Sequence, residues 1–195
     1  PLGYTFGRLG NFINGELWGR VTTASWGMIF VHAPRFSTSR GWVRETAEEA
    51  GITITESDQM VNLPRHPSQL YEAFFEGLFV WAILWFIFRK RSPFKGFMLS
   101  VYLISYGAVR FIIEYFREPD TGIGFPLKFG VQDNPIYRLI TPWNFTTGQI
   151  LCVLMIAAGI LGLFIFKALD TRQREKASQE SVSNIKGRKL RKRIK

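Results

Sequence analysis

The stretch Leu70–Phe88, LYEAFFEGLFVWAILWFIF, decides the fold of this chain. It is almost entirely apolar and aromatic, and its length is close to the roughly 20 residues that a helix needs to cross the apolar core of a bilayer. The run ends at Arg89, Lys90 and Arg91, a basic cluster of the kind found at the cytoplasmic end of membrane helices. We therefore expect an integral membrane protein.

Two further apolar runs lie downstream. They are GFMLSVYLISYGAVRFIIEYF at Gly96–Phe116 and GQILCVLMIAAGILGLFIF at Gly148–Phe166. Neither shows the alternation of apolar and polar residues that is typical of membrane barrel strands, so helices are the expected form. The predicted fold class is an all-α integral membrane protein, a polytopic helical bundle with a small mixed periplasmic lobe.

Basic residues are concentrated at the C-terminal end. Residues Lys167–Lys195 hold eleven of the 25 Lys and Arg but only three acidic residues, in a chain with a formal net charge of +10. A basic tail can neutralise nucleic-acid phosphates. This one directly follows an apolar run, which favours contact with anionic membrane lipids. We expect membrane lipids as partners and no nucleic acid.

The distribution of positive charge also orients the chain. The short basic loop 90–95 and the tail 167–195 are both expected on the cytoplasmic side, and the two crossings between them make the assignments consistent. Residues 21–68 and 117–147 then face the opposite side. The expected localisation is a multi-pass protein of the bacterial inner membrane, with a cytoplasmic C-terminus and periplasmic outward segments.

The chain divides into eight expected segments. They are the end of a truncated membrane element with a glycine-rich signature (1–20), a periplasmic lobe with a strand over Ser25–Val31 (21–68), a transmembrane helix (69–89), a cytoplasmic loop (90–95), a transmembrane helix (96–116), a periplasmic loop (117–147), a transmembrane helix (148–166) and a basic cytoplasmic tail (167–195). The chain begins at Pro1 within an apolar, glycine-rich stretch, so we expect an N-terminal portion to precede it. The single cysteine, Cys152, excludes an internal disulfide.

The first motif with chemical potential is GRLGNFINGELWGR at Gly7–Arg20. Its glycines allow close approach of the backbone to a ligand, and its arginines offer a fork of donors that matches phosphate oxygens. Another interpretation is a glycine-rich turn stabilised by a salt bridge from Arg8 or Arg20 to Glu16. Composition alone favours neither.

The second motif is GAVRFIIEYFREPD at Gly107–Asp120. Arg110 and Glu114 are four residues apart and share a helix face, which Arg117 continues. Arg110 lies roughly 9 Å inside the outer end of the apolar run, where an unpaired charge costs several kcal/mol. A functional arginine is favoured over an internal Arg110–Glu114 pair with a structural role only.

The third motif is RHPSQLYE at Arg65–Glu72, at the outer end of the first apolar run. His66 and Tyr71 are candidates for binding, although a lone histidine is more often an exposed loop residue. All three motifs fall at the same outward boundary of the membrane. We therefore expect them to converge on one pocket on the periplasmic side.

These three blocks, together with TTGQIL before the last apolar run, resemble the bacterial prolipoprotein diacylglyceryl transferases, and specifically their C-terminal portion. The resemblance implies transfer of the diacylglyceryl group of phosphatidylglycerol to the lipobox cysteine thiol of a prolipoprotein, the first step of lipoprotein maturation. The expected products are a thioether and glycerol phosphate. The expected partners are phosphatidylglycerol and the prolipoprotein signal peptide, with no metal and no cofactor.

The resemblance also implies roles for residues at matching positions. Arg8 and Arg110 are expected to be catalytic, and the expected substrate-binding residues are Arg8, Asn11, Glu16, Gly19, His66, Tyr71, Arg110, Glu114 and Arg117. One family feature, a histidine followed by glycines, does not occur here, so the catalytic base is expected in the preceding portion, with His66 as the weaker candidate base within this chain. Two other classes stay open, a transport or binding protein for anionic lipid and a purely structural bundle.

Overall fold

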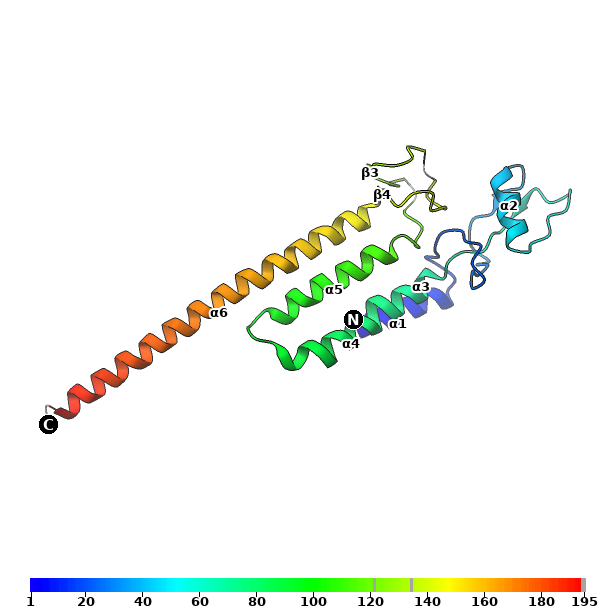
Figure 1. The fold of residues 1–195 in the computed structure, drawn as a ribbon. Coiled ribbons are helices and arrows are strands. Elements are labelled where there is room, and N and C mark those ends of the chain that lie inside the picture. The colour runs from blue at the N-terminus through cyan, green and yellow to red at the C-terminus, as the bar shows by residue number, and fades with distance from the viewer. Residues whose placement is uncertain (121, 134, 194–195) are drawn as a thin grey trace.

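The computed structural model describes residues 1–120, 122–133 and 135–193, with side chains described as far as Gln179. Four long helical segments lie side by side and form an elongated body (Figure 1). They are α1 (Leu2–Ile13), the helical segment Ser68–Arg91, α5 (Phe97–Ile113) and α6 (Thr147–Arg193). The protein is mostly helical, as expected.

The stretch quoted first forms most of the helical segment Ser68–Arg91, and it is not uniformly α-helical. The segment consists of α3 (Ser68–Tyr71), η1 (Glu72–Phe79), α4 (Val80–Ala82), η2 (Ile83–Phe88) and η3 (Arg89–Arg91). Both η1 and η2 are π-helical, and η3 is a 3₁₀ turn. Wide π-helical turns are uncommon and occur frequently at functional sites.

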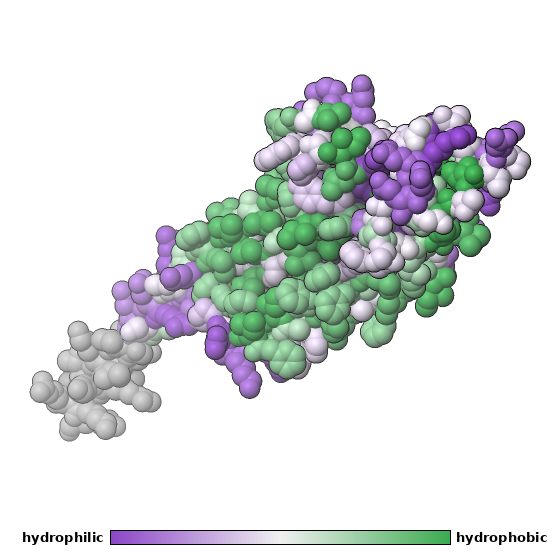
Figure 2. Space-filling model, turned by 45° about the vertical axis from the view of Figure 1, so that its right-hand side comes forward, coloured by the Kyte–Doolittle hydropathy of each residue, from purple (hydrophilic) through white to green (hydrophobic). Residues whose placement is uncertain are grey.

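Within the described residues, two helices are long and apolar enough to cross a membrane, Ser68–Arg91 and Thr147–Gln179. The apolar helix α5 is shorter. α6 does not end at Phe166, where the third apolar run ends, but continues to Arg193. Large apolar side chains such as Phe86 and Phe164 are both 70% exposed. On the face that Figure 2 shows, the helical body is mostly apolar and polar residues lie towards both ends, a distribution consistent with a membrane protein.

Glycines allow α5 and α6 to pack closely. A Cβ atom at Gly159 would lie 2.7 Å from Ile104 Cγ1, and one at Gly162 would lie 2.7 Å from Ser100 Oγ. Small residues at a helix crossing let two backbones approach, as is common between membrane helices. α5 and the first half of α6 therefore form one closely packed pair.

Residues 21–67 form a small lobe beyond the helical body (Figure 1). It contains α2 (Gly41–Glu49) and an antiparallel pair of short strands, β1 (Phe36–Ser37) and β2 (Met60–Val61). Its core consists of Phe36, Val43, Ala47 and Leu63.

The strand expected over Ser25–Val31 was wrong. A turn closed by the Gly27 N–H donating to the Ala24 carbonyl interrupts the segment, and only Met28 pairs with Arg65, as an isolated bridge. A tight turn in the middle of an apolar stretch prevents a continuous ladder.

The segment between α5 and α6, predicted as a loop, contains one short pair of strands. β3 (Leu127–Lys128) pairs antiparallel with β4 (Asn144–Phe145). Tyr137 from this segment stacks on Trp42 of α2, with ring centroids 5.0 Å apart. The lobe and this segment therefore pack against each other at the same end of the helical body.

Candidate active site

Arg110 is the centre of a buried network of charged side chains. Its Nη1 lies 2.8 Å from Glu72 Oε2 and 3.1 Å from Glu76 Oε1. Its Nη2 lies 2.9 Å from Glu114 Oε2. The four-residue spacing predicted that Arg110 and Glu114 share a helix face, and the two side chains do form the ion pair that the alternative, structural interpretation required. Arg110 also links α5 to η1, because Glu72 and Glu76 project from that segment.

Arg8 joins the network from α1. Its Nη2 lies 2.9 Å from Glu72 Oε2, the same oxygen that Arg110 contacts. The Tyr4 hydroxyl donates to Glu72 Oε2 over 2.9 Å and accepts from Arg8 Nε over 2.9 Å. Glu72 therefore bridges the two arginines that the family resemblance implicates in catalysis.

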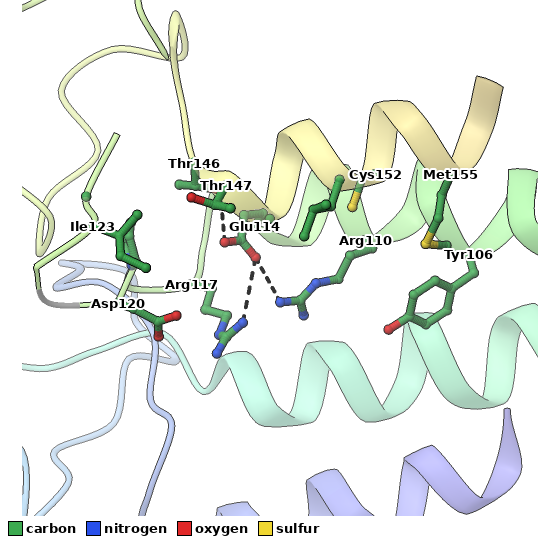
Figure 3. A pocket seen from close by; sticks show the side chains of 14 residues that line it. Tyr106, Arg110, Glu114, Arg117, Asp120, Ile123, Thr146, Thr147, Cys152 and Met155 are labelled. Atoms are coloured by element: carbon green, nitrogen blue, oxygen red, sulfur yellow. Dashed lines mark hydrogen bonds and ion pairs between the residues drawn. The ribbon is translucent and has the colours of Figure 1, made fainter. Parts of the chain in front are cut away.

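Glu114 occupies the other end of the network. Its Oε1 accepts a hydrogen bond from Thr146 Oγ over 3.0 Å. Its Oε2 faces both Arg110 and, at 3.9 Å, Arg117 Nη1. Figure 3 shows these three contacts converging on the Glu114 carboxylate. Arg117 is thus the most weakly paired guanidinium of the network.

The network is formally neutral, with three guanidinium groups and three carboxylates. The side chains of Glu72 and Glu76 are fully buried and that of Glu114 is 5% exposed, whereas those of Arg8 and Arg110 are 16% and 11% exposed. Buried charges are tolerated when they are paired and hydrogen-bonded. One oxygen each of Glu72 and Glu76 is buried with no hydrogen-bond partner among the described atoms, so acceptor capacity remains in the network.

A cavity of about 350 Å³ opens beside this network, between α5 and α6 and under the segment that joins them. Arg110, Glu114 and Arg117 lie along one wall (Figure 3). The remaining lining residues are Tyr106, Pro119, Asp120, Ile123, Gly124, Thr146, Thr147, Gly148, Leu151, Cys152 and Met155. The cavity thus combines two guanidinium groups, the carboxylates of Glu114 and Asp120, and a lining that is otherwise largely apolar. Its guanidinium groups suit an anionic group attached to apolar chains.

The three sequence motifs meet at a backbone junction outside this cavity. The Gly19 N–H donates to the His66 carbonyl over 2.9 Å, and the Arg20 N–H donates to the Phe116 carbonyl over 2.9 Å. A Cβ atom at Gly19 would lie 2.5 Å from the Phe116 oxygen and 2.6 Å from the His66 oxygen. Glycine is therefore required by close approach of the backbone, a structural role for one residue of the predicted binding set.

Arg20 and Arg65 hold this junction together. Arg20 is 2% exposed and donates from Nε to the Arg117 carbonyl over 2.8 Å; its burial lowers the pKa of Arg20 to about 10. Arg65 is fully buried and pairs with Glu118, and burial lowers the pKa of Arg65 as well. Among the described residues neither Arg8 nor Arg20 pairs with Glu16, so that alternative was wrong.

His66 and Tyr71 line a second cavity, of about 560 Å³, on the other side of α5. His66 Nδ1 lies 3.2 Å from the Tyr71 hydroxyl, which also accepts a hydrogen bond from Trp26 Nε1 over 2.8 Å. Burial lowers the pKa of His66, so its neutral form is favoured. The other lining residues are aromatic or aliphatic: Trp26, Phe75, Phe79, Val109, Ile112, Ile113 and Phe116.

The expectation of one shared pocket was therefore only partly correct. Arg110, Glu114 and Arg117 line the first cavity, and Arg8 reaches it through the network. The exposed Glu16 and the half-buried Asn11 line neither cavity. Glu16 contributes its carbonyl oxygen, which accepts from Gln69 Nε2 over 2.6 Å.

Sequence reasoning did not assign site roles to Tyr4, Glu72, Glu76 and Thr146. Glu72 and Glu76 carried a usable signal, because two acidic residues four apart inside an apolar run are candidates for function by their position alone. Tyr4 and Thr146 carried none, since a hydroxyl in an apolar helix end is common. No cluster of His, Cys, Asp and Glu suited to a metal ion occurs among the described residues.

Similarity to known proteins identifies the family. A family model described as prolipoprotein diacylglyceryl transferase matches residues 1–165. The protein named phosphatidylglycerol–prolipoprotein diacylglyceryl transferase in Treponema denticola is 52% identical to this chain, over 90% of this chain and 53% of the relative. The protein of the same name in Treponema pallidum is 51% identical, over 88% of this chain and 52% of the relative. A third, from Chlorobaculum tepidum, is 49% identical over 82% of this chain and 41% of the relative.

The chain spans about half the length of the curated relatives it matches. The match includes all three sequence motifs, the charged network and the cavity between α5 and α6, because each of them lies within residues 1–165. The chain belongs to the prolipoprotein diacylglyceryl transferase family.

Proposed function

We propose that this chain contributes the lipid-phosphate site of an enzyme that transfers the diacylglyceryl group of phosphatidylglycerol to the lipobox cysteine thiol of a prolipoprotein. The observation that carries the proposal is the position of Arg110. It lies at the convergence of three carboxylates and lines a cavity in an otherwise apolar helical body. The names of the relatives supply the substrate pair.

The proposed reaction is a substitution at carbon. The lipobox thiol loses its proton and becomes a thiolate, which is the better nucleophile. The thiolate attacks the glyceryl carbon bonded to the phosphate ester oxygen, a carbon–sulfur bond forms, and the carbon–oxygen bond breaks. The electron pair stays on the oxygen of the departing glycerol phosphate, so negative charge increases on the phosphate.

In this proposal Arg8 and Arg110 stabilise that charge, and Arg117 draws in the head group. Arg117 suits the attraction of the head group because its carboxylate partner among the described residues lies as far as 3.9 Å away. Arg110 suits the stabilisation of the leaving phosphate because its two terminal nitrogens are held in a fixed orientation by three carboxylates. Glu114 orients Arg110. A fixed guanidinium fork needs little reorganisation when charge develops.

The remaining residues of the predicted binding set contribute less directly. Asn11 and Glu16 line neither cavity, and they are proposed to orient either the glycerol hydroxyls or the arginines from the outer end of α1. His66 and Tyr71 are proposed to contact the prolipoprotein, because they border the apolar cavity of about 560 Å³ that an apolar signal peptide would favour. Gly19 keeps these elements close together.

We also propose that the chain lies in the bacterial inner membrane as a multi-pass protein. Its spans are residues 69–89, 96–116 and 148–166, and the loop 90–95 and tail 167–195 are cytoplasmic. The lobe 21–68, the segment 117–147 and the site then face the periplasm. The basic residues Arg89–Arg91 and the polar surface at both ends of the body support this orientation.

Mass spectrometry tests the proposed reaction. A synthetic lipobox peptide is incubated with membranes containing the full-length protein and phosphatidylglycerol, and the expected product has gained one diacylglyceryl unit. A peptide with serine in place of the cysteine and vesicles without phosphatidylglycerol are the controls. Lipid binding or counterflow with no new thioether would identify a transport or binding protein instead and overturn the proposal.

A further inference from the structure

We propose that the N-terminal end of α6, residues Thr146–Gln149, positions Arg110 by holding the Glu114 carboxylate. Gly148 is the central residue of this clamp. The proposal rests on the proposed function for its catalytic consequence, whereas the clamp itself can be tested without lipid transfer. Thr146, Gly148 and Gln149 were all outside the site predicted from the sequence.

The Glu114 carboxylate lies close to Gly148, which has no side chain. A Cβ atom there would lie 2.8 Å from Glu114 Oε1, 2.9 Å from Cδ and 3.2 Å from Oε2. The carboxylate therefore occupies the space that a side chain at residue 148 would need. The φ of Gly148 is not positive, so the backbone conformation does not need glycine there. The requirement for glycine at this position therefore comes from Glu114.

Thr146 and Gln149 fix the helix end around the carboxylate. The Thr146 N–H donates to Gln149 Oε1 over 3.0 Å, and the Gln149 N–H donates to Thr146 Oγ over 3.2 Å. This reciprocal arrangement is a capping box with glutamine as the acceptor. The Thr146 hydroxyl in turn donates to Glu114 Oε1. Thr146 and Gln149 are 2% and 1% exposed, so their geometry is protected from water.

The position of α6 adds an electrostatic contribution. The N-terminal end of a long helix carries partial positive charge, which favours a carboxylate beside it. The helix end and the Thr146 hydroxyl therefore favour the Glu114 carboxylate at this place in addition to its contact with Arg110.

Glu114 then determines where the Arg110 guanidinium points. Nη1 is drawn toward Glu72 and Glu76 on η1, and neither of these carboxylates lines the cavity. Nη2 is drawn toward Glu114, which does line it. Figure 3 shows Glu114 between the α6 end and Arg110. Without the clamp, only the contacts on the η1 side would orient Arg110, and the guanidinium would shift away from the cavity.

The test uses Gly148→Ala in the full-length protein in membranes. A displacement of about 1 Å at a reacting group can lower a rate by roughly 100-fold, so we expect kcat for lipid transfer to fall by roughly 10- to 100-fold. Glu114→Asp shortens the acidic side chain by one methylene and makes room for the new methyl group. We therefore expect the double variant Gly148→Ala/Glu114→Asp to be more active than Gly148→Ala alone. Thr146→Ser keeps the hydroxyl and should retain transfer, whereas Thr146→Val should lose it.

Two glycine variants serve as controls. Gly41→Ala places a methyl group in open space, and Gly162→Ala creates a contact as close as that at Gly148, 2.7 Å from Ser100 Oγ, but remote from Glu114. Gly162→Ala should lower the melting temperature in detergent while kcat stays within about threefold of the parent, the margin of an indirect effect. A loss of kcat in Gly162→Ala equal to that in Gly148→Ala would reduce the effect to general helix packing and overturn the proposal.

A second measurement separates this proposal from the proposed function. Melting temperatures of the parent, Gly148→Ala, Glu114→Asp and the double variant form a cycle that needs no activity, and non-additive values are expected for residues in contact. Additive melting temperatures overturn the clamp even when transfer is active. Non-additive values in a protein that transfers no lipid would uphold the clamp and refute the proposed function.

Discussion

Replacing Arg110 with lysine keeps the positive charge but removes the planar fork of donors, and we expect this change to lower the rate of lipid transfer. In the parent, two terminal nitrogens contact three carboxylates at 2.8, 3.1 and 2.9 Å. A lysine ammonium is a single point that lies either near Glu72 and Glu76 or near Glu114. One side of the network therefore loses its partner.

The size of the effect follows from the hydrogen bonds that each substitution removes. A hydrogen bond to a charged group contributes about 1.5–3 kcal/mol, and each 1.36 kcal/mol corresponds to about tenfold in rate. Removal of one such bond predicts a fall in kcat/KM of roughly 10- to 150-fold for Arg110→Lys. Arg110→Met removes all of these bonds and leaves buried carboxylates without a cation, which costs about 3–5 kcal/mol. This variant should also melt at a much lower temperature.

The assay is the appearance of diacylglyceryl peptide, measured by mass spectrometry over a range of phosphatidylglycerol concentrations. Arg174→Lys is the matched control. Arg174 also pairs with a carboxylate, that of Asp170, but the Arg174 side chain is 71% exposed. Its kcat/KM should equal that of the parent. Transfer by Arg110→Lys at the parental rate would refute the argument that fork geometry, rather than charge alone, is needed at this position.

Three further changes have defined expectations. Arg65→Met leaves Glu118 without its buried cation and should lower the free energy of unfolding, measured by denaturation in detergent, by about 3–5 kcal/mol. The double variant Arg65→Met/Glu118→Gln should recover part of this loss of stability. No recovery would show that the unpaired Glu118 is not the cause of the loss. Gly19→Ala forces the Phe116 and His66 backbones apart and should cost about 1–3 kcal/mol, while Gly41→Ala should cost much less. Burial lowers the pKa of His66, so His66 takes up a proton in the unfolded state before it does so in the folded state as the pH falls below 6.5. The stability that neutral His66 contributes is therefore fully present above pH 6.5 and is lost below it. His66→Gln should weaken this decline in melting temperature between pH 7 and pH 5 (roughly the range below the ordinary histidine pKa), and an unchanged decline would exclude His66 as its source.

Features that depend on one helix were predictable from the sequence. The Arg110–Glu114 pair follows from a four-residue spacing, which places both side chains on one face of any α-helix. The apolar runs likewise required helices, because a bilayer leaves no other partner for the backbone. The limits were local: the expected strand at Ser25–Val31 failed because the turn at Gly27 competes with strand pairing.

Features that depend on how helices pack were not predictable. Glu76 meets Arg110 only because η1 and α5 pack in one register, and the π-helical turns of η1 alter which side chains share a face. The sequence contains no signal for that register. The same limit explains why the three motifs meet at a backbone junction yet line two separate cavities on opposite sides of α5.

The neutrality of the network has a consequence for how a phosphate binds. Arg8, Arg110 and Arg117 are balanced by Glu72, Glu76 and Glu114, which explains how six ionisable side chains are accommodated in an apolar helical body. An anionic head group therefore meets no excess positive charge inside the network. In the proposed function, the head group binds first at Arg117, the least engaged cation, and then gains Arg110 by sharing that guanidinium with Glu114. In the proposed clamp the α6 end also holds Glu114, so Glu114 shares Arg110 without losing its own position, and we expect the network to stay assembled while the phosphate is bound.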